Sequence, residues 1–106
     1  MSTTVRDIIR ISKHKDASIF YEYDWSNWLR DGDSLSSSIG DHSFTVVDAD
    51  SGLTIDEKDV IGNITYCRIS GGNASIAEWR VKIAAKGTLD PDEIGVIELW
   101  ITVWGD

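Results

Sequence analysis

The chain has 106 residues, near the usual size of one domain, and this length leaves no room for a second hydrophobic core. Hydrophobic residues make up 42% and charged residues 26%, which excludes general disorder and suffices for a packed core. The formal net charge of -8 argues against nucleic acid and anionic membranes as partners, because both bind clusters of Lys and Arg.

The N-terminal segment mixes charged and aliphatic residues and lacks the apolar run of a signal peptide, and nowhere does the chain approach the roughly 20 apolar residues that span a bilayer. The single cysteine, Cys67, cannot form an intrachain disulfide, which suits a reducing compartment. We therefore expect a soluble protein of a cytoplasm. Residues 1–15 are predicted to form a flexible arm, and residues 16–106 the folded domain. The arm is expected to order only against a neighbouring subunit, through Ile8, Ile9 and Ile11.

Strand and turn signals alternate through the first half of the domain. Residues 17–24 are rich in β-branched and aromatic types and predict a strand. Trp25 and Trp28, three residues apart, favour one helical turn after that strand and are predicted to close one end of the domain. After a Gly-Asp turn, residues 34–39 and 42–47 predict two short strands that pair as a hairpin.

The second half of the domain continues the pattern. Two short apolar runs, residues 53–55 and 60–61, flank a charged loop, and residues 63–70 predict the next strand. In residues 77–85 apolar and polar side chains alternate, which is typical of a strand with one buried face, and Trp79 falls on that face.

Residues 94–104 predict the last strand, paired with residues 77–85 across a loop that contains the only proline. Its core-facing side is expected to consist of Ile97, Leu99, Ile101 and Val103. The opposite side carries Val96, Trp100 and Trp104, an apolar surface in excess of what the core needs. We expect these three residues to be exposed on the protomer and to lie at a subunit interface.

About seven short strands, with turn signals roughly every ten residues and no long helical stretch, predict an all-β fold, a small antiparallel β-sandwich. Three motifs then stand out: Tyr-Asp-Trp-Ser-Asn-Trp-Leu at residues 23–29, Gly-Asp-Ser-Leu-Ser at 32–36 and Ile-Ser-Gly-Gly at 69–72. Together they resemble a family of small tailed-phage virion proteins, the fiber-tail adaptor proteins. The resemblance implies an immunoglobulin-like sandwich that serves as an assembly module near the head, neck or tail fibres and has no enzymatic activity.

No residue set predicts a catalytic or metal site. The acidic turn of residues 48–52, with Asp59, lacks the spacing of an EF-hand, so we expect a solvated turn. His14 and His42 have no cysteine or carboxylate at ligand spacing and are interpreted as surface residues. Cys67 is expected to be a small buried residue, and no nucleophile elbow is present. We therefore expect no enzyme, no metal and no cofactor.

Three functions remain open from the sequence. The first is a phage virion adaptor or connector, a homo-oligomer whose partners are capsid, neck, tail or fibre subunits and which is assembled in the host cytoplasm. Repetition in a ring or lattice strengthens the weak contacts of such a protein. The second is a capsid decoration protein, and the third is a carbohydrate-binding module that uses Trp and acidic loops. The sequence specifies neither the position in the virion nor the oligomer number.

Overall fold

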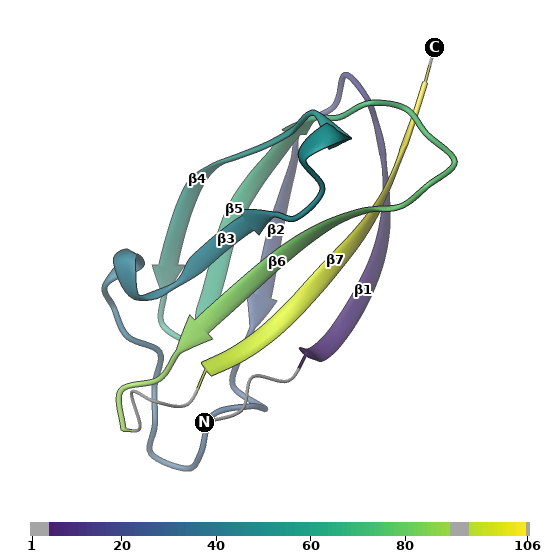
Figure 1. Ribbon diagram of the computed structural model, residues 1–106. Helices are drawn as coiled ribbons and strands as arrows, with labels where there is room; N and C mark the ends of the chain where they lie inside the picture. Colours follow the sequence, from purple (N-terminus) through teal and green to yellow (C-terminus); the bar gives the residue numbers. More distant parts are fainter. Residues whose placement is uncertain (1–4, 90–93, 106) are drawn as a thin grey trace.

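The computed structural model describes residues 5–89 and 94–105, which form seven strands and two one-turn 3-10 helices (Figure 1). In chain order these are β1 (Val5–His14), β2 (Ile19–Asp24), η1 (Ile39–Asp41), β3 (Ser43–Val46), η2 (Ala49–Ser51), β4 (Leu53–Ile61), β5 (Ile64–Gly71), β6 (Trp79–Lys86) and β7 (Ile94–Trp104). The all-β fold expected from the sequence is confirmed.

The strands lie in two facing sheets, one with the order β1-β7-β6-β3 and the other with the order β2-β5-β4 (Figure 1). In the lettering of an immunoglobulin constant domain, β2-β5-β4 corresponds to B-E-D and β7-β6-β3 to G-F-C. All strand pairs are antiparallel except that of β1 with β7, which is parallel. The predicted sandwich is therefore confirmed, with an immunoglobulin-like strand order.

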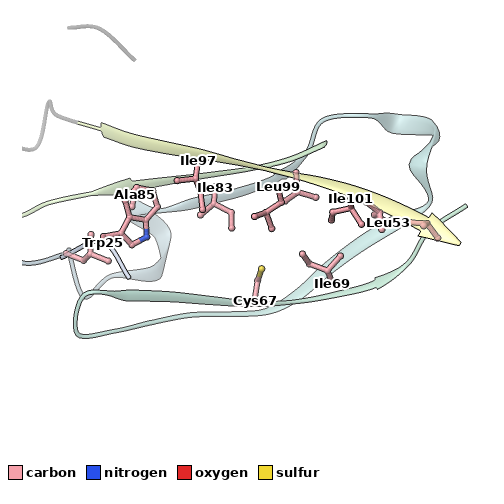
Figure 2. Close-up of a cluster of buried hydrophobic side chains, with 12 residues drawn as sticks. Trp25, Leu53, Cys67, Ile69, Ile83, Ala85, Ile97, Leu99 and Ile101 are labelled. Carbon is pink, nitrogen blue, oxygen red and sulfur yellow. The ribbon is translucent and has the colours of Figure 1, made fainter. Parts of the chain in front are cut away.

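The core lies between the sheets (Figure 2). The predicted inner side of β7 is buried as expected, and it consists of Ile97, Leu99, Ile101 and Val103. Cys67 and Ile69 of β5 point toward this row from the opposite sheet, and Trp25 closes one end (Figure 2). Alternation along β5, β6 and β7 thus gives each sheet one dry face and one outer face.

The prediction of a flexible arm is wrong for residues 5–14, because these residues form β1 and pair with β7. Ile9 and Ile11 face inward and pack against the core. At the end of β1 the buried amine of Lys13 donates to the carbonyl oxygens of His14 (2.8 Å) and Gly71, which ties β1 to the opposite sheet. Local patterns do not reveal this strand, because its only partner in the sheet lies near the other end of the chain. Residues 1–4 lie outside the described residues.

The middle of the chain differs from the expectation in two details. Residues 34–39 form no regular strand but only an isolated antiparallel bridge between Leu35 and Gly87, and the amide of Leu35 donates to Asn63 Oδ1 (3.1 Å). β3 therefore pairs with β6 rather than in the predicted hairpin. The charged residues 56–59 form no loop but belong to β4, which passes through a bulge where Glu57 has a φ of 49°.

Candidate docking surfaces on the two sheets

Trp100 and Trp104, two of the predicted interface residues, lie on the outer surface of the β1-β7-β6-β3 sheet. Trp104 is 55% exposed, and its ring meets that of His14 edge-on with the centroids 4.7 Å apart. Trp100 is half-buried under Arg10, whose Cζ lies 4.9 Å from the ring centroid, and its Nε1 donates to Glu98 Oε1 (3.0 Å). Trp104 thus offers bare aromatic surface, whereas Trp100 is partly covered by a guanidinium.

The remaining predicted interface residues fall into two groups. Ile8 is 45% exposed and lies on the same outer surface, beside Glu98. Ile9 and Ile11 pack against the chain's own core instead. Val96 is only 2% exposed, so the expectation that it is exposed beside the two tryptophans is wrong. β7 is an inner strand, and Val96 lies between Val5 of β1 and Ala84 of β6 in the register of the sheet.

The charged outward positions of this sheet are four basic residues and one acidic residue: Arg10, Arg80, Lys82, Lys86 and Glu98. Together with Trp100 and Trp104 they define the basic face. Ion pairs fix two of the guanidinium groups, since Arg80 Nη2 lies 3.0 Å from Asp48 Oδ1 and Arg10 Nε lies 3.3 Å from Glu78 Oε2. Hydrogen bonds from Arg80 lower the pKa of Asp48, so this pair is ionised at neutral pH.

The outer surface of the β2-β5-β4 sheet has the opposite charge, and this charged surface was not predicted from the sequence. Its charged outward positions are four acidic residues and one basic residue: Glu22, Asp24, Asp56, Asp59 and Arg68. The guanidinium of Arg68 is itself paired, with Nε 2.9 Å from Asp56 Oδ1 and Nη1 3.5 Å from Glu57 Oε1. A hydrogen bond from Arg68 lowers the pKa of Asp56, and hydrogen bonds from Ser26 lower that of Asp24. The surface therefore keeps its negative charge at neutral pH.

Apolar side chains occupy the same surface. Phe20 is 65% exposed and Ile61 is 59% exposed, with the half-buried Ile64 and Tyr66 between them. We call this surface, with its five charged residues, the acidic face. Period-two alternation in β2 places Phe20 on the side of the strand that carries the acids, and this was the available sequence signal. Exposed apolar side chains interspersed with charged ones are typical of a protein-binding surface.

The groups that could take part in catalysis have structural roles. Cys67 is buried, and burial raises the pKa of its thiol to about 11, which keeps it protonated at neutral pH. His42 is buried rather than at the surface as expected. Its Nε2 lies 2.7 Å from the carbonyl oxygen of Ser36, and its Nδ1 accepts the amide N–H of Lys86 (3.1 Å).

Within residues 5–89 and 94–105, no cluster of three His, Cys, Asp or Glu side chains could hold a metal ion. In the same ranges no helix has the length and apolar character needed to cross a membrane.

A comparison with known protein families identifies the family of this chain. The family described as podophage GP4 fiber-tail adaptor protein gp77 matches residues 13–96. The chain belongs to this family. The resemblance noted from the sequence is thereby confirmed, and a phage structural protein is the role that the family supports. No curated protein matches the chain. The matched segment contains β2 to β6 and all of the acidic face, whereas Trp100 and Trp104 follow it.

The tryptophan motif of this fiber-tail adaptor chain has a structural role. Trp25 is fully buried, donates from Nε1 to Thr65 Oγ1 (3.0 Å) and packs edge-on against Trp28 with the ring centroids 5.6 Å apart. Gly95 of β7 lies against this pair, and a Cβ at that position would come within 2.8 Å of both rings. Trp25 closes one end of the sandwich (Figure 2), and Trp28 packs against it there, as the sequence predicts.

The Gly-Asp motif of the family supports the same end of the sandwich. Asp33 Oδ1 accepts the amide N–H groups of Ser34 (2.7 Å), Thr88 (3.1 Å) and Leu89 (3.1 Å) and the hydroxyl of Thr88 (3.0 Å). Burial alone would raise the pKa of Asp33, but these hydrogen bonds outweigh it and lower that pKa. Two of the three motifs that carry the family resemblance therefore build one end of the molecule, whereas the third, residues 69–72, lies at the other end of β5.

Proposed function

We propose that this protein is a non-enzymatic connector of a phage virion that joins fibres to the tail. The observation that carries the proposal is the family match over residues 13–96, which includes five complete strands. The partners are then tail and fibre subunits, and the site of action is the assembled particle, built in the host cytoplasm.

The sandwich has the mechanical properties of a connector. A joint between two assemblies needs a body that does not deform, and close-packed cores resist deformation. Among the described residues, every buried side-chain nitrogen and oxygen has a hydrogen-bond partner, which favours one fixed arrangement. The Lys13 amine of β1 bonds to the carbonyl oxygen of Gly71 in the opposite sheet, so a polar contact joins the two layers as well as apolar ones.

Contacts within the virion would use the exposed apolar side chains. On the basic face the proposed contact residues are Trp104, Trp100 and Ile8, and on the acidic face they are Phe20 and Ile61. Aromatic groups surrounded by charges concentrate binding energy in protein interfaces. The proposal assigns no chemistry to Cys67 or His42, whose polar atoms are buried within the fold.

Removing the gene from the phage tests the proposal. We expect particles with filled, stable heads whose tails lack fibres, and restoration of the fibres when the protein is supplied in trans. Electron microscopy of negatively stained particles measures both features. Fibre-bearing particles whose heads lose DNA on mild heating would contradict the proposal and favour capsid decoration instead.

A further inference from the structure

We propose that neighbouring copies of this chain bind each other through unlike faces, the acidic face of one copy on the basic face of the next. This contact goes beyond the joining of fibre to tail, and it is a property of the isolated protein. It can therefore be tested without the virion, and its failure would leave the adaptor role intact.

Charge is the first argument. The outward strand positions of the basic face hold four cations and one anion, and those of the acidic face hold four anions and one cation. Two of the four cations are paired with Glu78 and Asp48, so together with Glu98 three carboxylates offset them and leave an excess of one positive charge on this face. The chain as a whole has a net charge of -8. The two sheets form opposite sides of the sandwich, so each molecule presents one positive and one negative surface (Figure 1).

The apolar groups on the two faces are the second argument. Phe20 and Ile61 lie exposed on the two edge strands of the acidic face, and Trp104 lies exposed at the end of β7, beside His14. The planar guanidinium of Arg10 lies over the ring of Trp100, and such a pair can bind both carboxylates and aromatic edges. Each face thus combines exposed apolar side chains with charges of complementary sign.

Complementary signs also determine the symmetry of the contact. Two acidic faces in contact would bring like charges together at a cost in free energy, and two basic faces, each with an excess of one positive charge, would gain no attraction. A head-to-tail contact avoids this cost. A contact of this kind closes into a ring if the rotation between copies is right and otherwise extends into a row. In either case both ends of each sandwich remain free for other proteins.

A nucleic acid is the competing ligand for a positive surface. The basic face includes Glu98, and Arg10 and Arg80 are already paired with Glu78 and Asp48. With a net charge of -8 the chain as a whole repels phosphates. A second copy of the chain, whose acidic face is also partly apolar, fits the observations better.

Two single substitutions test the proposal on the full-length chain, Phe20→Asp on the acidic face and Trp104→Asp on the basic face. Each variant should lose self-association, with the dissociation constant rising about tenfold or more. An equimolar mixture should form a one-to-one dimer, because each variant keeps the face that the other lacks. Analytical ultracentrifugation of each variant and of the mixture measures this, and raising the salt concentration should weaken the wild-type contact.

Ile76→Asp is the matched control, since Ile76 is a fully exposed aliphatic residue in the loop before β6 and on neither face. It should associate like the wild type, and circular dichroism should show all three variants folded. The proposal is overturned if the wild type stays monomeric up to about 1 mM at low salt, the upper limit for a weak specific contact. It is also overturned if either face variant alone associates as strongly as the wild type, because a contact between like faces would then be responsible.

Discussion

At the scale of single residues, the tryptophans differ in what covers them. Trp25 is enclosed by the core, Trp79 packs against it, Trp100 is partly covered by Arg10, and Trp104 is mostly bare. The same side chain therefore stabilises the fold at some positions and remains available to partners at another.

Trp25→Ala is expected to lower the free energy of unfolding by about 3 to 5 kcal/mol, because it leaves a large cavity. It also removes the indole donor of the buried Thr65 hydroxyl. Trp104→Ala serves as the control and should change stability by less than about 1 kcal/mol, as is usual at exposed positions. Urea denaturation followed by circular dichroism measures both. Equal losses in the two variants would contradict the assignment of Trp25 to the core and Trp104 to the surface.

Cys67 provides a chemical probe of the same core. Its thiol is buried and has a pKa raised to about 11, above the value near 8.5 of a free cysteine. The folded protein should therefore resist DTNB at pH 8, and the thiol should react only as fast as the chain unfolds. Adding urea up to the unfolding midpoint should accelerate the reaction in parallel with the loss of circular dichroism. Rapid modification of the native protein would show that the two sheets separate locally around β5.

At the scale of elements, β1 is the least expected part of the fold, and two adjacent isoleucines test it. Ile9 packs against the core and Ile8 faces outward. Ile9→Asp should lower the free energy of unfolding by at least about 2 kcal/mol, because it buries a carboxylate without a partner. Ile8→Asp should change it by less than about 0.5 kcal/mol, as at other surface positions. Thermal melting distinguishes the two. If both variants melted with the wild type, residues 5–14 would behave as the flexible arm.

Sequence-based prediction succeeded where the contacts join strands that are neighbours in the chain, and it failed where the partner strand is distant in the sequence. Alternation in β6 and β7 predicted their pairing and the buried row of β7, because neighbouring strands determine both. The parallel pairing of β1 was not predictable, since it depends on a partner far away in sequence. The acidic face was missed for another reason. Each strand contributes only three residues to it, and the face exists only once β2, β5 and β4 are side by side.

At the scale of the whole molecule, the chain is a rigid sandwich in which Trp25, Trp28 and Asp33 stabilise one end, and whose two outer faces carry opposite charge. Each feature has a separate role in a connector. The core and the motifs maintain the shape, the faces are proposed to bind neighbouring copies, and the ends are left for tail and fibre.

Position in the particle tests this account most directly. A cryo-EM map of the intact virion, refined locally on the tail, should contain density for the seven-stranded sandwich between the tail and the fibre attachment point. Sandwich density on the capsid shell, with none between tail and fibre, would contradict the account.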